Sequence, residues 1–399
     1  MFLSRLRLLT AGESHGPLLT GILDGVPAGL PLDATIIDHD LARRQRGFGS
    51  GGRMQLEQDH ARLTGGVLAG RTTGGPIALT IANADHTNWA ERDIAPMTVP
   101  RPGHADLTGA IKFGHEDLRL SLERASARET AMRVAAGAIC RALVQHFGIF
   151  VGGYVVRIAD AELTTPPDLA DQASLRSACE RAELDPVRCP DATSGAAMRA
   201  AIEAAIAARD TCGGIIEVVA LGVPAGLGSY TAADRRLDAS LAAALLSVPA
   251  CKGVEFGAGF AATAWPGTEA QDELHLDGDR IVRHSNHAGG LEGGITNGMP
   301  IVLRAAIKPI ATTLTPQRSV DLATGQPATT RYERSDHCQV PRAVPVAEAM
   351  LSLVLADALL SKLGGDSLVE LEPRFAALRQ PRLADLPMHG RPWRFDYRE

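Results

Sequence analysis

The sequence is poor in aromatic residues and has no closely spaced cysteines. Aromatic residues make up 4% of its 399 positions, and the six cysteines never form a Cys-x-x-Cys pair. Scattered cysteines argue against a zinc ribbon and against a disulfide scaffold. We therefore expect reduced thiols, no metal site and a cytoplasmic location.

Long hydrophobic runs and a strong charge imbalance are also missing. No stretch of about 18 uncharged apolar residues occurs, so no membrane span is expected. The N-terminus reaches a charge at Arg5, too soon for a signal peptide. The net charge of −6 does not favour nucleic acid as a partner. With 45% hydrophobic residues and no clear linker, we expect one domain over residues 1–399, with a C-terminal tail, 365–399, of open function.

What is present is a pattern of short apolar strands and Ala-rich helices. Residues 127–147 carry one apolar stripe, which predicts a helix, and Ser126 with Glu129 predicts a capping box at its start. Further helices are expected over 196–209 and 345–363. The last of these is apolar on nearly all sides and therefore belongs in the protein interior. Strands are expected at 151–158, 215–221 and 300–307, and surface excursions at 164–194 and 314–331.

One six-residue segment occurs twice, about half a chain apart. The sequence Gly-Val-Pro-Ala-Gly-Leu spans residues 25–30 and again 222–227. A segment of helical character with acidic and basic residues follows each copy, at 38–44 and 234–246. An ancient duplication would explain the pair, and chance recurrence of a common turn type is the alternative.

The loop over residues 10–16, Thr-Ala-Gly-Glu-Ser-His-Gly, is the first candidate for chemistry. The run Leu6 to Leu9 predicts the end of a short strand, and the glycines predict a tight turn with His15 at its tip. A histidine in such a turn can titrate near neutral pH and reach a ligand. A lone loop histidine is more often structural or solvated, so its role depends on the other segments.

Two arginine-rich segments predict anion binding. At Ser126, the backbone N–H groups of a helix start and the guanidinium groups of Arg124 and Arg128 suit phosphate or carboxylate. Between residues 43 and 53, four arginines and four glycines predict a lid over an anionic ligand. The alternatives are a plain helix cap with surface arginines for the first segment and an RNA-binding loop for the second.

Three further loops carry residues suited to catalysis or to close ligand contact. His104 follows a Pro-Gly turn within 101–106, and Asp336 lies within 333–338, directly before the apolar helix. Residues 289–298 hold five glycines, which predicts a close approach of the backbone to a ligand. Two histidines and an aspartate also match, in composition, the facial triad of a non-haem iron site, although no pair has helical ligand spacing.

Together, these segments resemble those of the chorismate synthase family. The matching stretches are TAGESHG (10–16), RPGHAD (101–106), LERASARETAMRVAAGA (122–138), KGVEFG (252–257), GGLEGGITNGMPI (289–301), KPIAT (308–312) and ERSD (333–336). They follow the family order over most of the chain.

The resemblance implies a fold and a reaction. The fold is an α+β, β-α-β sandwich with a helical core between antiparallel sheets and pseudo-duplicated halves, usually assembled as a homotetramer. The reaction is the 1,4-elimination of phosphate from 5-O-(1-carboxyvinyl)-3-phosphoshikimate, which gives chorismate in the shikimate pathway of aromatic amino acid biosynthesis. It needs reduced FMN but has no net redox change. NADPH and a separate flavin reductase are both open as the source of reduced FMN; the lack of a GxGxxG motif after a strand favours the reductase.

The resemblance also implies roles for residues at matching positions. His15 is expected to protonate or hydrogen-bond the reduced flavin, His104 to protonate the leaving phosphate, and Asp336 to help remove the ring proton at carbon 6. The residues expected at FMN are Arg124, Ala125, Ser126, Pro249, Ala250, Gly293, Lys308, Pro309, Ile310, Ala311, Thr312 and Arg334. Those expected around the anionic groups of the substrate are Ser14, Arg44, Arg53, Arg101 and Arg128.

The chain departs from the family pattern at a few of these positions. Ala125 replaces a common serine, Pro249 a frequent asparagine, and Ala311 a proline. Pro249 lacks a backbone donor. In the arginine-rich lid, Ser50 replaces an arginine, and Arg46, at a position that is often glycine, is expected to restore part of the charge.

Two other functions remain as alternatives at this stage. A non-catalytic relative would bind a flavin or a phosphorylated metabolite without turning it over, and the intact His15, His104 and Asp336 argue against it. A flavin oxidoreductase would oxidise its flavin whenever substrate is converted.

Overall fold

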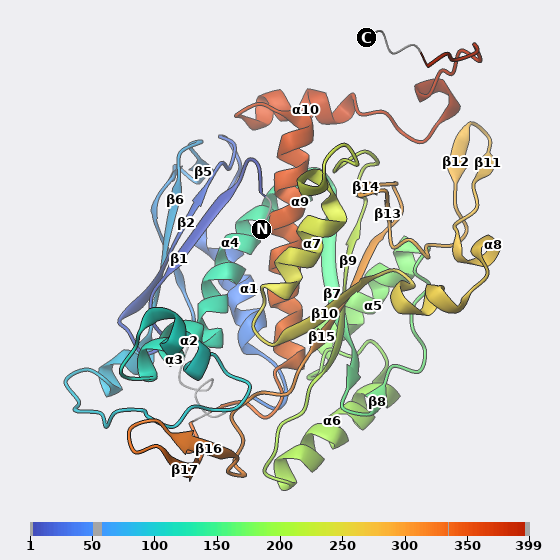
Figure 1. Cartoon of the computed structure of the whole chain (residues 1–399). Coiled ribbons are helices and arrows are strands. Elements are labelled where there is room, and N and C mark those ends of the chain that lie inside the picture. Colours follow the sequence, from blue (N-terminus) through green and yellow to red (C-terminus); the bar gives the residue numbers. More distant parts are fainter. Residues whose placement is uncertain (1–2, 51–57, 334, 396–399) are drawn as a thin grey trace.

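The computed structural model describes residues 3–50, 58–333 and 335–395. Two antiparallel sheets lie on either side of a layer of long helices (Figure 1). The chain therefore has the predicted α+β sandwich fold. In spatial order the first sheet consists of β1 (Arg7–Ala11), β2 (Leu18–Asp24), β6 (Ile77–Ala82) and β3 (Ala61–Gly65). The second consists of β10 (Cys251–Phe256), β15 (Ile301–Ile307), β9 (Gly214–Leu221), β7 (Phe150–Ile158) and β8 (Ala161–Glu162).

The inner layer is built from four helices, α1 (Ala34–Gln45), α4 (Thr130–His146), α7 (Leu237–Leu246) and α9 (Val340–Leu363). Helix α4 packs on the first sheet and α9 on the second, and the two helices pack on each other. Their axes come close at Gly137, where an added Cβ would lie 2.3 Å from the Cβ of Ala349. Only glycine permits this approach.

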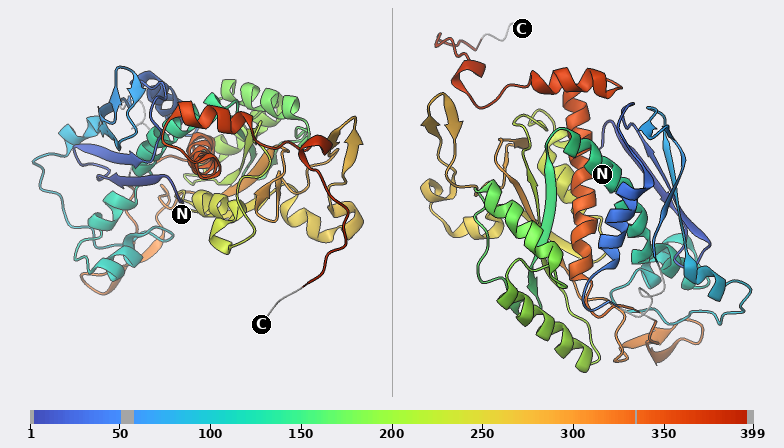
Figure 2. Two further views of the ribbon diagram at one scale, coloured as in Figure 1. Left: turned by 90° about the horizontal axis from the view of Figure 1, so that it is seen from above. Right: turned by 180° about the vertical axis from the view of Figure 1, so that it is seen from behind.

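Helix α9 occupies the centre of the molecule, as the view from above shows (Figure 2). Among the described helices it is the one long and apolar enough to cross a membrane, yet 94% of its most apolar window is buried inside the fold. This is the behaviour of a core helix. The helix begins at Val340 rather than at Pro345, because Pro341 takes the first turn and Pro345 is accommodated inside the helix.

The two sheets repeat one topology. The order β1-β2-β6-β3 corresponds strand for strand to β7-β9-β15-β10. The strands β2 and β9 each run into a Gly-Val-Pro-Ala-Gly-Leu turn, which leads to α1 in the first half and to α7 in the second. Each turn pairs with a small hairpin, β4–β5 (Val67–Leu68, Arg71–Thr72) or β13–β14 (Leu291–Glu292, Ile295–Thr296). The repeated turn therefore marks a duplicated unit and is not a chance recurrence.

Two local expectations were wrong. Residues 164–194 are not a surface excursion, because α5 (Gln172–Leu184) buries Leu175, Ala178 and Ala182 and contacts β7. The capping box at the start of α4 does not form. Ser126 accepts a hydrogen bond from the backbone N–H of Arg128, but the Glu129 carboxylate binds Thr10 and Arg133 instead.

The remaining elements lie around this core. Helix α6 (Ala192–Ala207) contacts β7 and β8. The expected surface excursion at 314–331 is a hairpin of β16 (Arg318–Asp321) and β17 (Gln326–Thr329). In the tail, α10 (Leu368–Ala376) buries Leu368 and Leu371, whereas most residues after it are exposed. The other short elements are α2 (Asp106–Phe113), α3 (Arg119–Ala125), α8 (Gly267–Ala270), β11 (His275–Asp277) and β12 (Arg280–Val282).

Candidate active site

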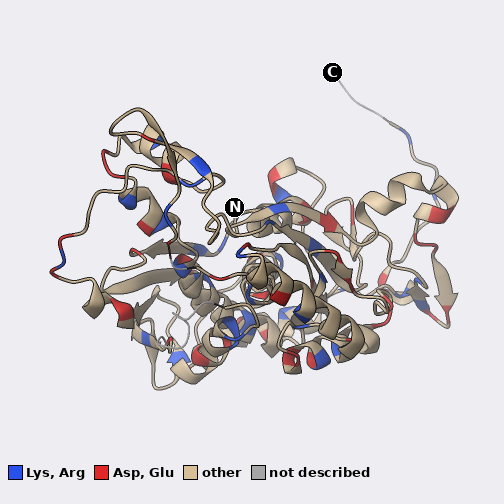
Figure 3. Ribbon diagram, turned by 90° about the horizontal axis from the view of Figure 1, so that it is seen from below, with Lys and Arg blue, Asp and Glu red and all other residues tan. Residues whose placement is uncertain are grey.

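A cavity of about 660 Å³ lies at the end of the sandwich where α4 and α9 begin, which is the lower end in Figure 1. Both halves of the chain line it. The first half contributes the loops of His15 and His104, and the second half contributes Asp336 and the segment 308–312. Seen from below, basic and acidic residues are interspersed at this end (Figure 3). Two arginines of the lining already have acidic partners, Arg44 in Asp59 and Arg101 in Asp106.

The cavity brings together most of the residues that the sequence singled out. They come from segments far apart in the chain, which the fold joins at one end. The predicted residues that line the cavity are Ser14, His15, Arg44, Arg101, His104, Ala125, Ser126, Arg128, Pro249, Ala250, Lys308, Pro309, Ile310, Ala311, Thr312 and Asp336.

Two of the predicted residues that the structure describes, Arg124 and Gly293, do not line the cavity. Arg124 is outside the lining and donates hydrogen bonds to the carbonyls of Thr10 and Gly12, at 2.8 and 3.2 Å, so it ties down the His15 loop. Gly293 lies in the β13–β14 hairpin. The neighbouring Gly294 carbonyl accepts a hydrogen bond from the backbone N–H of Leu237, the first residue of α7, whereas Pro249 of the cavity lining comes shortly after the other end of that helix. Arg53 and Arg334 lie outside the described residues.

The lid residues that depart from the family pattern are not part of the cavity lining. Arg46 is exposed. The Ser50 hydroxyl donates a hydrogen bond of 2.7 Å to the carbonyl of Gly47. The cavity lining therefore gives no support to the idea that Arg46 replaces the missing charge.

His15, in the turn after β1, is held by a carboxylate from helix α3. After β1, Gly12 adopts a φ of 110°, and a Cβ there would lie 2.6 Å from the carbonyl oxygen of Leu18. The turn presents His15 to Glu123 of α3, with Nδ1 2.6 Å from Oε1 and the backbone N–H donating to Oε2 at 2.8 Å. The indole of Trp89 lies against the imidazole, with 4.2 Å between ring centroids. The ring is therefore fixed on one edge and one face.

His104 has a similar partner. Its Nδ1 contacts Asp106, a fully buried residue at the start of α2. Asp106 also accepts hydrogen bonds from Nε and from Nη2 of Arg101, at 2.8 and 3.0 Å. Burial by itself raises the pKa of Asp106, but the hydrogen bonds from His104 and Arg101 outweigh it and hold that pKa well below its usual range.

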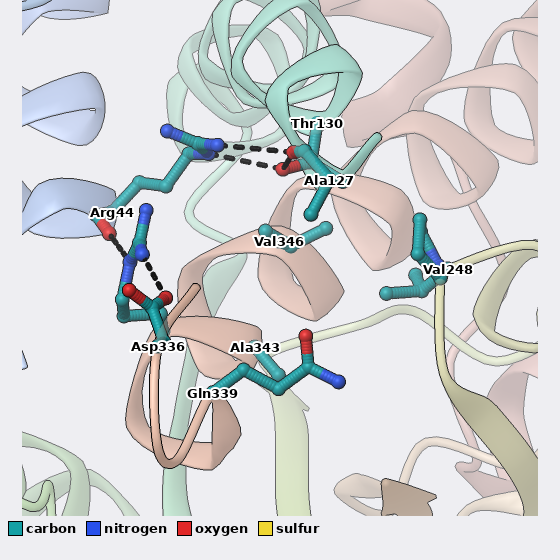
Figure 4. Close-up of a pocket in the computed structure, with 10 residues that line it drawn as sticks. Arg44, Ala127, Thr130, Val248, Asp336, Gln339, Ala343 and Val346 are labelled. Atoms are coloured by element: carbon teal, nitrogen blue, oxygen red, sulfur yellow. Dashed lines mark hydrogen bonds and ion pairs between the residues drawn. The ribbon is translucent and has the colours of Figure 1, made fainter. Parts of the chain in front are cut away.

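A cluster of three guanidinium groups shares two carboxylates beside the cavity. Arg128 binds Asp59 at 2.6 Å, Arg44 binds the same carboxylate at 3.4 Å, and Arg342 binds Asp336. Arg44 also reaches Thr130 and the carbonyl of Ala127 (Figure 4).

Positive charge is in excess in this cluster. The pKa of Arg44 is lowered to about 9, first because burial disfavours the charged form and then because Arg342 and Arg128 repel it. An anion bound here would compensate that charge.

The chemistry of the lining fits a flavin phosphate as well as a phosphorylated carboxylic acid. The volume of about 660 Å³ is typical of a cofactor site. Small or apolar residues suited to a flat ring, Pro249, Ala250, Pro309 and Ile310, adjoin the cation Lys308. Among the described residues, no group of three or more His, Cys, Asp or Glu side chains could hold a metal ion.

Several residues of the site were missed at the sequence level. Glu123 and Asp106 lie inside motifs that had been recognised, and the rule that a loop histidine needs an orienting acid could have found them. Asp59, Trp89 and Arg342 give no local signal, because only the fold brings them to the cavity.

The comparisons with known proteins point to one family. The family model described as chorismate synthase matches residues 6–360. The chorismate synthase of Moorella thermoacetica is 52% identical over 94% of this chain and 98% of its own length, and that of Aquifex aeolicus is 49% identical over 94% and 98%. A crystal structure of chorismate synthase, 43% identical, superposes with a TM-score of 0.78 over 94% of this chain and 97% of that one. The chain belongs to the chorismate synthase family.

Proposed function

We propose that this chain is a phosphate lyase that converts 5-O-(1-carboxyvinyl)-3-phosphoshikimate to chorismate and phosphate with the help of reduced FMN. The observation that carries the proposal is the cavity itself. It combines an under-compensated arginine cluster with two carboxylate-bound imidazoles and the Asp336 carboxylate. A substrate with one phosphate and two carboxylate groups, and its acid–base elimination, need these groups in one place.

The arginines bind and orient the substrate. Arg44 and Arg128 are pre-oriented by Asp59, so they lose little side-chain freedom when an anion arrives. Arg342 has two partners. Its Nε–H donates to the backbone carbonyl of Arg44 at 3.1 Å, and its Nη1 donates to the Asp336 carboxylate. Anion binding is thereby coupled to the position of Asp336.

Proton transfer is assigned to three residues. His104 protonates the phosphate as it leaves, and Asp336 takes part in removing the proton at carbon 6. His15 holds or donates a proton at the flavin. Reduced FMN, when bound, would supply electron density that stabilises positive or radical character on the substrate as the carbon–oxygen bond breaks. The residues that would hold it are Ala125, Ser126, Pro249, Ala250 and Lys308 to Thr312.

We also propose that the chain assembles with copies of itself, as a homotetramer. The outer face of the first sheet supports this, because Leu9 and Ile22 form a cross-strand pair and are 68% and 42% exposed. Sedimentation velocity of Leu9→Arg, with the exposed Leu184→Arg as control, tests it. Dissociation by the first variant alone supports assembly through this face, and a monomeric wild type contradicts assembly.

The lyase proposal is tested by measuring phosphate and chorismate release under anaerobic conditions. Reduced FMN in catalytic amount should support many turnovers, whereas oxidised FMN or no flavin should support none. Phosphate release that does not depend on reduced FMN would contradict the proposal. Flavin binding without product would favour the non-catalytic alternative.

A further inference from the structure

Two acidic residues outside the assigned machinery each hold one of the two cavity histidines at the same atom. Glu123 Oε1 lies 2.6 Å from Nδ1 of His15, and Asp106 Oδ1 contacts Nδ1 of His104. The two pairs are on separate segments, α3 with the first loop and the 101–106 turn with α2. The same arrangement therefore arises twice, from unrelated local structures.

We propose that Glu123 and Asp106 are positioning residues that keep the hydrogen of each neutral imidazole on Nδ1, so that Nε2 exchanges the catalytic proton. This inference rests on the proposed function for its consequence but not for its geometry. Both residues lie within matched motifs, Asp106 in RPGHAD and Glu123 in LERASARETAMRVAAGA.

The tautomer follows from the charge of the carboxylates. An ionised carboxylate only accepts hydrogen bonds, so the nitrogen next to it has to be the donor. Burial alone would raise the pKa of Glu123, but the hydrogen bonds from the ring and the backbone of His15 outweigh this effect. The pKa is therefore lowered overall, and the carboxylate is ionised at neutral pH. The same balance applies to Asp106, where Arg101 adds to the lowering.

The hydrogen bonds of Glu123 make this position sensitive to amide substitution. Both of its oxygens accept from His15, one from Nδ1 and the other from the backbone N–H at 2.8 Å. Glutamine has one acceptor, its carbonyl oxygen, and one donor group, its NH₂, so it cannot accept from both Nδ1 and the backbone N–H of His15 through separate oxygens. If its carbonyl satisfies the backbone, its NH₂ group meets Nδ1 and moves the imidazole hydrogen to Nε2.

The second pair contains a competing contact. Nη2 of Arg101 lies 3.0 Å from Nδ1 of His104, so an N–H of Arg101 could donate to a bare Nδ1. That geometry would place the hydrogen on Nε2. Because Asp106 is fully buried and also binds Arg101, we assign the donor role to Nδ1 and pair Arg101 with the carboxylate.

Other charged or titratable groups surround these rings without replacing the carboxylates. His86 Nδ1 lies 2.9 Å from the carbonyl oxygen of His15, and Arg119 acts on Glu123. Glu13 lies on the same turn as His15. Near His104, Lys308 binds the carbonyl of Gly103.

The test is the tautomer itself, read from long-range ¹H–¹⁵N spectra of protein with ¹⁵N-labelled imidazoles. The spectra are recorded without flavin or substrate, at a pH where the rings are neutral. His15→Asn and His104→Asn variants identify the two resonances among the 12 histidines. In wild type, both rings should carry their hydrogen on Nδ1, unlike histidine in water, which favours Nε2. A hydrogen on Nε2 in either ring would overturn the assignment for that pair.

Variants then connect the tautomer to catalysis. Glu123→Gln and Asp106→Asn should move the hydrogen of the neighbouring ring toward Nε2 and lower kcat about 10²-fold, with KM little changed. Glu123→Asp, which keeps an acceptor, should restore Nδ1–H and part of the activity. Glu116→Gln, an exposed change on the segment before α3, is the matched control and should alter neither.

The two readouts separate this inference from the proposed function. An unchanged tautomer and unchanged kcat in Glu123→Gln and Asp106→Asn would overturn the positioning role. If the protein released no phosphate at all, the lyase proposal would fail, while the wild-type tautomer would still decide whether the carboxylates act as assigned.

Discussion

Thr72 and Thr296 make the same four hydrogen bonds in the two halves of the chain. Each hydroxyl donates to the carbonyl of the proline in the repeated turn, at 2.6 and 2.7 Å, and accepts from the N–H of the turn's last leucine, at 3.0 and 2.8 Å. Each backbone also exchanges hydrogen bonds with the glycine and leucine of the turn. In both halves, the repeated turn is thus hydrogen-bonded to its hairpin through the same set of atoms.

This equivalence predicts equal sensitivity to loss of the hydroxyl. Thr72→Val and Thr296→Val each leave a buried carbonyl and a buried N–H without their partner, which should cost about 1–3 kcal/mol of unfolding free energy. Urea unfolding measures the loss, and Thr→Ser at the same positions keeps the hydroxyl as control. A valine variant as stable as wild type would show that the clamp is energetically irrelevant.

The second prediction concerns His15. His15→Ala removes the imidazole that Glu123 and Trp89 hold at the cavity, and turnover should fall by about 10²–10⁴-fold, the usual contribution of general acid–base catalysis. Flavin affinity should change far less, because most of the expected flavin contacts lie elsewhere in the lining. Steady-state turnover and flavin titration measure the two effects. Unchanged turnover would remove His15 from the mechanism.

Asp336 gives a third prediction. Asp336→Asn keeps the size of the side chain but lacks the base, so the reaction should stop after substrate has bound. Arg342 loses its anionic partner in this variant, so its charge becomes available to the substrate and binding should not weaken. Anaerobic single-turnover kinetics measure the step directly. A normal single-turnover rate would refute the assignment of Asp336 as base.

The acid stability of the protein should depend on Asp106 and Glu123. Both have a pKa lowered by folding, so they add stability that is fully present above their unfolded pKa, near pH 4, and is lost as the pH falls below it. Asp106→Asn should therefore unfold more readily than wild type at neutral pH but lose less further stability on acidification. Urea unfolding across this pH range measures the slope. Parallel pH profiles for the two proteins would contradict the linkage.

The sequence predicted the core elements because their signals are local. The stripe from Met132 to Phe147 and the all-apolar run after Pro345 appear as α4 and α9, within a few residues of the expected bounds. The start of α4 differs from the expected residue 127, because one residue near it had two possible sets of partners. Glu129 could cap its own helix, yet the fold offers it Arg133 and Thr10 instead.

The site was predictable only as separate segments. Motifs identified His15, His104 and Asp336, but nothing in the spacing of the chain indicates that Glu123 rather than Glu13 faces His15. Asp59 is a further case, since its role depends on Arg44 and Arg128, which approach it from α1 and from the turn before α4. Such pairings are set by tertiary packing, which a local pattern does not encode.

The central claim is that the flavin assists the reaction without being consumed. Anaerobic absorption spectra of reduced FMN bound to the enzyme, recorded before substrate addition and after its complete conversion to chorismate, test it most directly. We predict that the flavin is reduced at both times, while phosphate accumulates in large excess over flavin. Oxidation of one flavin for each substrate converted would contradict the account and identify an oxidoreductase.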